Sequence, residues 1–343
     1  MKTVKIKYCD FWNHWNENDN FIINTLKKKY NVEISENPDY IFFSNFNEEF
    51  QHMDYNDCVK IFYTQENIVP DFNYADYGIG YDNISFQDRY LNFPIYLIPE
   101  RYGKYWDLMK VKHLVKNDSE MLDRGFCSFV VSNADADEIR RDTFERLCKY
   151  KKVDSGGKYL NNIGLTDGVA DKLDFSKKYK FSLCFENTSH PGYTTEKIIE
   201  AFAAQTVPIY WGDPEISKLF NQKAFINVTN CKSVGEILKR VEEIDSDDLK
   251  YLEMLKAPAL NTNISDSYWE EKQKEFEKFL SSIFDQEKEN AIRRNMKFWG
   301  AEYHRRYYEM RTVFLEKKYS FSKRSIDFLR RVKHVISRSV RTK

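Results

Sequence analysis

The residues from Tyr179 to Pro214 decide the fold, and they read YKFSLCFENTSHPGYTTEKIIEAFAAQTVPIYWGDP. The apolar run at the start, Tyr179–Phe185, predicts a buried strand. After a polar loop that contains glycine and proline, Thr194–Ala204 has the spacing of a helix, and Val207–Trp211 predicts a second buried strand. A strand, a helix and a strand in succession indicate a βαβ unit, in which the two strands are parallel.

The polar turn between the first strand and the helix suits an anion. A helix N-terminus offers unpaired backbone N–H groups and a partial positive charge. Lys197 adds a full charge in the first turn, and Asn187 and Tyr193 can donate hydrogen bonds to the same oxygens. These residues predict a site for a nucleotide diphosphate. The alternative is an ordinary capped helix in which Glu196 only complements the dipole. The chain has neither a P-loop nor a GxGxxG motif.

The rest of the chain alternates short strands with helices in the same way. The other predicted strands are Val4–Tyr8, Tyr40–Ser44, Val59–Thr64, Tyr77–Tyr81, Cys127–Ser132 and Phe225–Val228. The other predicted helices are Phe21–Lys29, Glu138–Tyr150 and Ser233–Ile244. This pattern predicts an α/β fold with parallel sheets.

A chain of 343 residues is long enough for two domains. The glycine-rich connection Lys152–Lys158 is the clearest candidate boundary. We therefore predict an α/β domain over 1–153, a second α/β domain over 154–300, and C-terminal helices with a basic tail over 301–343. Ligands of open α/β sheets bind beyond the carboxyl ends of the strands, so the two domains are expected to face each other across a cleft.

Composition narrows the class and the compartment. Lys+Arg and Asp+Glu both number 53, so net charge gives no case for a nucleic-acid partner. None of the six cysteines forms a CxxC pair, and Cys127 and Cys184 stand in apolar runs, which favours reduced thiols in a reducing compartment. The N-terminus has no apolar signal region, and no stretch has the length of a membrane span. We therefore expect an unanchored, cytoplasmic protein.

The last segment is strongly basic. From Lys317 to Lys343 it carries Asp327 as its one acidic residue, and its apolar residues recur three or four apart. These apolar positions are Ile326, Leu329, Val332, Ile336 and Val340. Such a basic amphipathic helix can lie on an anionic membrane surface, which would place the protein on the inner face of the cell membrane. The alternative is a solvated tail that packs one stripe on its own protein.

Three parts of the opening stretch together resemble a family signature, namely Phe185–Thr188, Tyr193–Lys197 and Val207–Gly212. The signature is that of the α-1,3-fucosyltransferases, glycosyltransferase family 10, and the similarity is greatest to their bacterial, unanchored branch. The resemblance implies the GT-B fold, with two Rossmann-like domains. It also implies inverting transfer of L-fucose from GDP-β-L-fucose to the GlcNAc or glucose of a LacNAc-type glycan. By family habit, the acceptor is a lipopolysaccharide or another surface glycan, and the product a Lewis x-type antigen.

The resemblance also assigns roles to individual residues. It implies that Glu66, in the sequence TQEN, is the general base, because inversion in one displacement requires removal of the acceptor proton. It makes Arg140 a phosphate ligand, with the adjacent Arg141 left open. Asn187, Tyr193 and Lys197 carry over as donor-binding residues. Glu196 carries over as a carboxylate for sugar hydroxyls.

The acceptor site and the metal question rest on weaker patterns. Trp12, His14 and Trp15 follow the first strand, where aromatic rings can stack on sugars, although a packed aromatic cluster is the alternative. Asp135-Ala136-Asp137 mimics the DxD metal motif of the other major sugar-transferase fold. Such a triplet arises often by chance in an acidic-rich chain, so we expect no required metal or cofactor and at most stimulation by a divalent ion.

Three competing hypotheses remain from the sequence. The first is a GT-B enzyme that uses a different sugar nucleotide, and the second is a non-catalytic, membrane-associated glycan-binding protein. The third is a metal-dependent enzyme that acts through Asp135 and Asp137 and is inactivated by EDTA. The presence of Glu66 together with the predicted phosphate cluster argues against the second hypothesis.

Overall fold

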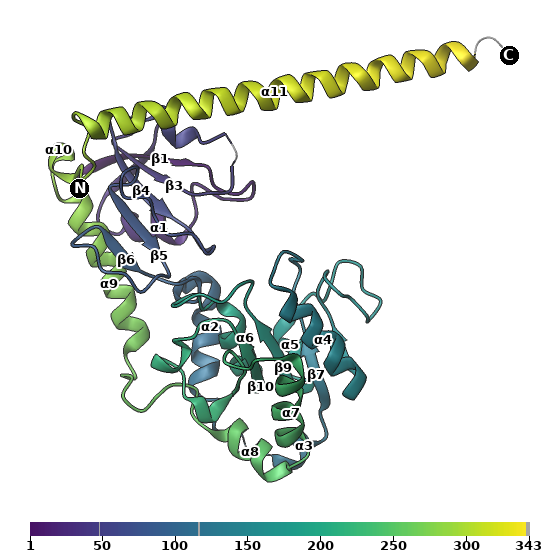
Figure 1. The fold of residues 1–343 in the computed structure, drawn as a ribbon. Helices are drawn as coiled ribbons and strands as arrows, with labels where there is room; N and C mark the ends of the chain where they lie inside the picture. The colour runs from purple at the N-terminus through teal and green to yellow at the C-terminus, as the bar shows by residue number, and fades with distance from the viewer. Residues whose placement is uncertain (48, 116, 341–343) are drawn as a thin grey trace. The chain divides into compact units, whose positions relative to one another are not determined.

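Two sheets organise the chain (Figure 1). The computed structural model describes residues 1–47, 49–115 and 117–340. Contacts divide the chain into two units. The first unit comprises Met1–Thr64, Pro70–Gly78 and the chain from Ser281 onward. The second comprises Gln65–Val69 and Ile79–Leu280.

The bounds of the elements are as follows. The first sheet contains β1 (Thr3–Cys9), β2 (Asn31–Ile34), β3 (Tyr40–Phe43), β4 (Val59–Tyr63), β5 (Tyr77–Gly80) and β6 (Tyr90–Asn92). The second contains β7 (Gly125–Phe129), β8 (Val153–Ser155), β9 (Tyr179–Phe185), β10 (Val207–Trp211) and β11 (Ile226–Asn227). The first α-helices are α1 (Phe21–Lys27), α2 (Pro99–Lys110), α3 (Asp118–Leu122), α4 (Glu138–Tyr150), α5 (Lys172–Ser176) and α6 (Glu196–Ala203). The later ones are α7 (Val234–Asp245), α8 (Asp248–Lys256), α9 (Tyr268–Phe284), α10 (Lys288–Ala291) and α11 (Trp299–Val340).

The two sheets have the same kind of strand order. The first runs β2-β1-β3-β4-β5-β6, and β1 pairs in parallel with both β2 and β3. The second runs β11-β10-β9-β7-β8, with parallel pairing throughout. In each sheet the order reverses at one point, which lies between β1 and β3 in the first and between β7 and β9 in the second. Such switch points are where open α/β sheets bind ligands.

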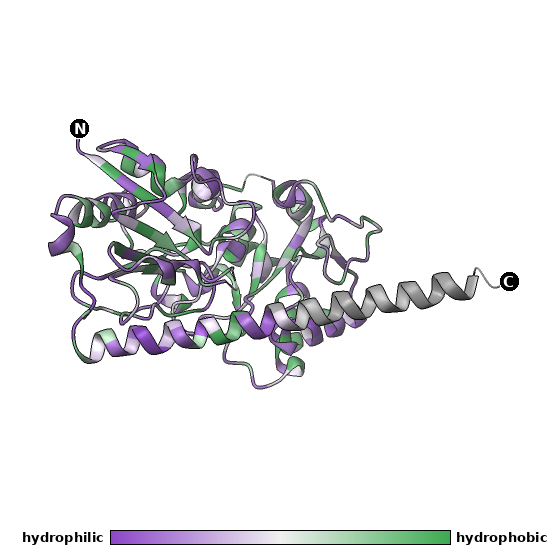
Figure 2. Cartoon of the chain, turned by 90° about the horizontal axis from the view of Figure 1, so that it is seen from above, coloured by the Kyte–Doolittle hydropathy of each residue, from purple (hydrophilic) through white to green (hydrophobic). Residues whose placement is uncertain are grey.

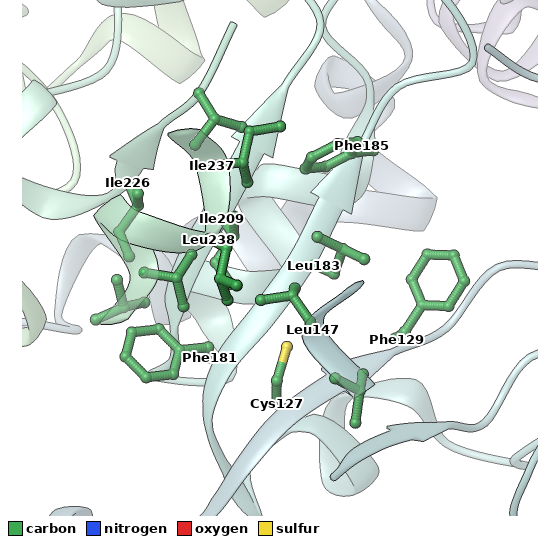
Figure 3. Packing of buried hydrophobic residues seen from close by; sticks show 14 of the residues in the cluster. Cys127, Phe129, Leu147, Phe181, Leu183, Phe185, Ile209, Ile226, Ile237 and Leu238 are labelled. Carbon is green, nitrogen blue, oxygen red and sulfur yellow. The ribbon is translucent and has the colours of Figure 1, made fainter. Parts of the chain in front are cut away.

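The core of the second unit forms around β9. Phe181, Leu183 and Phe185 alternate along this strand, so they share one face of the sheet. They pack together with Leu147 of α4 and Ile237 of α7 (Figure 3). Because helices cover a parallel sheet on its faces, its central strand reads as a nearly continuous apolar run. This confirms the buried strand predicted from the sequence.

The division of the chain differs from the predicted boundary between residues 153 and 154. Strand β7 and helix α4 precede that boundary, yet β7 pairs with β9 and α4 packs on the second sheet. The glycines that suggested a linker serve another purpose. Gly156 donates its N–H to Phe129, and a Cβ on Gly157 would lie 1.9 Å from the carbonyl oxygen of Val131. Gly157 therefore allows two segments of one unit to approach closely, and this corrects the interpretation of the segment as an interdomain connection.

The end of the chain completes the first unit. Phe284, at the end of α9, stacks on Tyr40 of β3 with ring centroids 4.3 Å apart. Arg294 and Asp76 form a fully buried ion pair, with the Arg294 Nε atom 3.0 Å from the carboxylate. Because a buried charge requires a partner, these two residues fix the returning chain against the strands.

Helix α11 carries apolar side chains that are exposed in the described residues. Trp299, Met310 and Val313 are among them, and apolar and polar patches alternate along the coloured part of the helix in Figure 2. The apolar positions from Ile326 to Val340 that suggested an amphipathic tail have side chains outside the described residues. Among the described residues, no helix is both long and apolar enough to cross a membrane.

Candidate active site

A pocket of about 450 Å³ lies within the second unit. Its walls come from the chain after β7, the loop after β9, helices α2, α4, α5 and α6, and the Gln65-Glu66 segment. The residues that line it are Gln65, Glu66, Ile95, Arg101, Val130, Val131, Ser132, Asn133, Arg140, Lys172, Asn187, Tyr193, Thr195, Glu196, Lys197 and Glu200. The pocket therefore includes Glu66 and every residue predicted to bind the donor.

The pocket lies at the switch point of the second sheet. Ser132 and Asn133 follow β7, and Asn187 follows β9. These are the carboxyl ends of the two strands between which the order reverses, so the topology alone places a ligand site here. The size is typical of a pocket for a small molecule.

A charge network links three residues between the end of β9 and the first turn of α6, namely Glu186, Thr195 and Lys197. The carboxylate of Glu186 is fully buried and accepts hydrogen bonds from the backbone N–H of Thr195 at 2.8 Å and from its hydroxyl at 2.7 Å. Lys197 donates to the same carboxylate at 2.8 Å. Gly212 is required beside it, because a Cβ there would lie 2.5 Å from Glu186 Cγ, and its φ is +155°. The network therefore fixes the start of α6 and holds the Lys197 charge at the pocket.

The N-terminus of α6 has backbone N–H groups that can bind an anion. Thr195 precedes the helix but, among the described residues, its side chain caps none of the first-turn N–H groups. Instead, its hydroxyl donates a hydrogen bond to Glu186. The first-turn N–H groups and the ammonium of Lys197 face the same end of the helix, an arrangement that suits phosphate.

Arg140 belongs to the pocket and Arg141 does not. Arg140 is 1% exposed and donates to the Asn187 side-chain oxygen at 2.9 Å and to the carbonyl of Asn133 at 2.6 Å. The side chain of Arg141 is 49% exposed and lies beside Asp142. Of the two arginines left open by the sequence, the structure thus places Arg140 beside the predicted donor residues.

Tyr193 connects the donor loop to the segment that carries Glu66. It is 2% exposed, and its ring packs edge-on against Tyr81 with the centroids 4.8 Å apart. The hydroxyl of Tyr81 donates in turn to the side chain of Asn67. Burial raises the pKa of both tyrosines, so both remain protonated hydrogen-bond donors near neutral pH.

Glu66 is half-buried and its pKa is raised from the ordinary value. Burial is the main cause, the charge of Lys197 opposes it, and the charge of Glu196 adds to it. A carboxylate with a raised pKa accepts a proton more readily than an exposed glutamate does. Glu196 differs, because burial raises its pKa but the charges of Lys197 and Lys172 outweigh burial and lower it.

Several pocket residues were not predicted from the sequence. Arg101, Lys172 and Glu200 line the pocket, and Glu186, which is not among the lining residues, accepts a hydrogen bond from Lys197 beside it. Glu200 could have been found, because it stands four residues after Glu196 on the same helix face. Arg101 and Lys172 reach the pocket from α2 and α5, and no local motif marked them.

The DxD triplet has a structural role in the described chain. Asp137 caps helix α4 by accepting a hydrogen bond from the N–H of Ile139 at 3.0 Å. Asp135 is exposed, and its N–H bonds to Asn133. Among the residues described, no group of three His, Cys, Asp or Glu side chains is placed to hold a metal.

The predicted acceptor residues lie in the first unit, at the switch point of its sheet. Phe11, Trp12 and Trp15, which we call the aromatic loop, follow β1. The Trp12 and Trp15 rings have centroids 4.9 Å apart, and Trp12 meets Phe46, which follows β3, at 5.1 Å. His14 is exposed. The loop is thus a packed cluster, as the alternative predicted, while Trp12 and Trp15 keep part of their surface exposed.

Two α/β units with parallel sheets, and a basic pocket at a helix N-terminus in the second, define a glycosyltransferase of the GT-B class. The family is shown by two matches. Residues 6–99 match the N-terminal domain of alpha-(1,3)-fucosyltransferase FucT. Residues 121–299 match the C-terminal domain of glycosyltransferase family 10 (fucosyltransferase). The chain belongs to glycosyltransferase family 10.

Individual relatives agree with this assignment. The chain is 34% identical over 275 residues to the alpha-(1,3)-fucosyltransferase FucT of Helicobacter pylori, a match that covers 71% of this chain and 57% of the relative. The chain therefore spans little more than half the length of that relative. A crystal structure of an alpha1,3-fucosyltransferase has a TM-score of 0.70 at 29% identity, covering 87% of this chain and 93% of the other. Another, with GDP-fucose, has a TM-score of 0.65 at 30% identity, covering 82% and 91%.

Proposed function

We propose that this chain is an inverting α-1,3-fucosyltransferase that moves L-fucose from GDP-β-L-fucose to the GlcNAc or glucose of a LacNAc-type glycan. The observation that carries the proposal is that Glu66, Arg140 and Lys197 line one pocket at the start of α6. A general base and a phosphate site are the two parts that such a displacement requires. The family gives the sugar nucleotide.

The reaction is a single displacement. The acceptor hydroxyl attacks the anomeric carbon of fucose while its proton passes to the Glu66 carboxylate. The bond from that carbon to the β-phosphate oxygen breaks, and its electron pair leaves with GDP. Attack from the face opposite the leaving group converts the β-linked donor into an α-linked product.

Positive charge stabilises the departing diphosphate. Burial lowers the pKa of Lys197, but the charges of Glu186 and Glu196 outweigh it and raise the pKa overall, so the side chain stays charged. Arg140 is held by Asn187 and Asn133, and its planar guanidinium suits two phosphate oxygens at once. Because these cations can neutralise the leaving group, we propose that no metal is required.

The remaining donor contacts follow from the same pocket. Asn187 and Tyr193 are proposed to bind the diphosphate through hydrogen bonds. Glu196 is ionised and lines the pocket, so it is proposed to accept hydrogen bonds from sugar hydroxyls. Trp12, His14 and Trp15 are proposed to contact the acceptor, because aromatic surface at a switch point suits a sugar face.

The cellular setting is a further part of the proposal. The tail from Lys317 onward is basic, and apolar side chains of α11 are exposed before it begins. These features support attachment to an anionic membrane surface from the cytoplasm, with a lipopolysaccharide or another surface glycan as the acceptor.

The test of the reaction is GDP release from GDP-fucose in EDTA, with and without N-acetyllactosamine. Wild-type protein is expected to release GDP only with the acceptor. Glu66→Gln, which keeps the shape but cannot take the proton, is expected to lose about 10²–10⁴-fold in kcat while it still binds GDP-fucose. Asp135→Asn serves as the matched control and is expected to retain activity. Full turnover by Glu66→Gln would exclude it as the base, and loss of activity in EDTA would contradict the metal-free mechanism.

The membrane proposal is tested by sedimentation with vesicles. Protein ending at Glu316 is expected to stay in solution with vesicles that contain phosphatidylglycerol, while the full chain sediments with them. With a soluble acceptor, both proteins are expected to release GDP from GDP-fucose at equal rates. Equal sedimentation of the two would contradict the role of the tail.

A further inference from the structure

The pocket holds an ion pair that the phosphate chemistry does not use. The Lys172 ammonium, from α5, lies 2.5 Å from the Glu200 carboxylate of α6, and their side chains are 30% and 13% exposed. Both residues line the pocket. A second, small cavity beside them, about 20 Å³ in volume, is also lined by both residues and by Lys197. The pair is therefore part of the pocket wall.

The position of Glu200 separates it from the phosphate end. It stands four residues after Glu196, hence about one turn, or roughly 5–6 Å, farther along α6 from the N-terminus. A carboxylate beside a diphosphate would be repelled by it. This part of the pocket thus suits an uncharged portion of the nucleotide that presents hydrogen-bond donors and acceptors side by side.

We propose that Lys172 and Glu200 recognise the guanine base of the donor nucleotide. This inference rests on the proposed use of GDP-fucose. The edge of guanine presents the O6 acceptor next to the N1–H and N2–H donors. An ammonium donates to O6, and a carboxylate accepts from N1–H and N2–H together. The observed pair presents that pattern, with its two charges held beside each other by the ion pair.

The same chemistry sets the selectivity. Hypoxanthine has O6 and N1–H but lacks the 2-amino group, so it loses one of the two bonds to Glu200 and none of those to Lys172. Removal of the carboxylate should therefore abolish the preference for guanine over hypoxanthine. Removal of the ammonium should weaken the binding of both bases equally. These opposite signatures separate base recognition from a structural role of the pair.

The experiment measures dissociation constants of GDP, inosine diphosphate and pyrophosphate by calorimetry on the full chain. Wild-type protein is expected to bind GDP about 10-fold or more tightly than inosine diphosphate. Glu200→Ala should bring that ratio close to one, and the isosteric Glu200→Gln should also reduce it. Lys172→Met should weaken both nucleotides by about 10-fold or more, with an unchanged ratio and unchanged pyrophosphate binding. Lys177→Met, from an exposed pair with Asp174 just after α5, is the matched control and should change nothing.

Each contrary result is informative. A GDP preference that survives in both Glu200 variants would overturn the proposal, as would pyrophosphate binding that falls with Lys172→Met, because that would make Lys172 a phosphate ligand. A wild-type protein that does not bind GDP at all would overturn the proposed function together with this inference. Wild-type protein that binds GDP and inosine diphosphate with equal affinity would overturn this inference alone.

Discussion

The switch points of the two sheets carry side chains of different chemistry. After β9 in the second unit, Glu186, Thr195 and Lys197 hold one another through hydrogen bonds of 2.7–2.8 Å. After β1 in the first unit, the aromatic loop packs ring against ring, with Phe11 and Trp15 centroids 4.4 Å apart. The topology makes a ligand position in both sheets, but only the side chains decide which chemistry it serves. A network of buried charges fixes individual atoms, whereas an aromatic cluster offers a surface.

The largest expected effect comes from breaking the charge network. Glu186→Gln leaves the Lys197 charge buried without its carboxylate, so the free energy of unfolding should fall by about 3 kcal/mol. The matched control is Glu243→Gln, which breaks an ion pair with Lys250 at the same N···O distance of 2.8 Å but with exposed partners. The control should leave the urea unfolding curve of the protein unchanged. Equal curves for the two variants would show that burial of the network contributes nothing.

The next effect separates two neighbouring arginines. Arg140→Ala should weaken GDP binding about 10- to 100-fold, because a hydrogen bond to a charged group is removed from a buried site. Arg141→Ala removes the same charge from an exposed position and should leave the affinity within twofold. Calorimetry with GDP measures both. An equal loss in the two variants would indicate that long-range charge, rather than the geometry at Asn187, determines binding.

A smaller effect concerns the pH dependence of the reaction and the influence of Glu196 on the pKa of Glu66. The base must be ionised, so kcat/KM should fall as pH decreases through its pKa, and burial places that midpoint above the ordinary 4.5. The charge of Glu196 contributes to the rise, so Glu196→Gln should move the midpoint to lower pH. The pH profile of GDP release with saturating donor tests this. A midpoint that moves to higher pH would contradict the stated coupling.

The smallest effect is expected at the aromatic loop. Trp12→Ala should raise the KM for the acceptor by about fivefold, because one aromatic stacking surface is lost, while the affinity for GDP stays constant. Trp299→Ala, an exposed tryptophan of α11 in the same unit, is the control and should leave both constants unchanged. A change in GDP affinity for Trp12→Ala would place the loop in donor binding instead.

The sequence predicts some features of the site better than others. The β9–α6 turn could be placed within two residues because strand, glycine-containing loop and helix start each leave a local pattern. The choice between Arg140 and Arg141 could not be made, because neighbouring helix residues point in directions about 100° apart and the partner that decides between them, Asn187, is distant in sequence. The family resemblance supplied Glu66, since a half-buried loop glutamate carries no local signal.

Other parts of the fold could not be predicted for identifiable reasons. Strand β8 has three residues and is followed by two glycines, so Val153–Ser155 resembled a connection. Lys172 and Glu200 come from two helices, and their pairing depends on how α5 and α6 pack. The boundary at 153 was misplaced because alternation of strands and helices continues unchanged from one sheet to the next.

The discontinuous first unit has a consequence for the order in which the protein is made. Translation delivers residues 79–280 between Gly78 and Ser281, which takes roughly 10–40 s at about 5–20 residues per second. By the end of that time, the second unit has all its strands and can fold. Phe284 and Arg294, which contact Tyr40 and Asp76 in the first unit, have not yet been synthesised. The first unit is therefore completed after the second, and a nascent chain that ends at Leu280 would carry every strand of the first sheet but lack Phe284, which stacks on Tyr40, and Arg294, which pairs with Asp76.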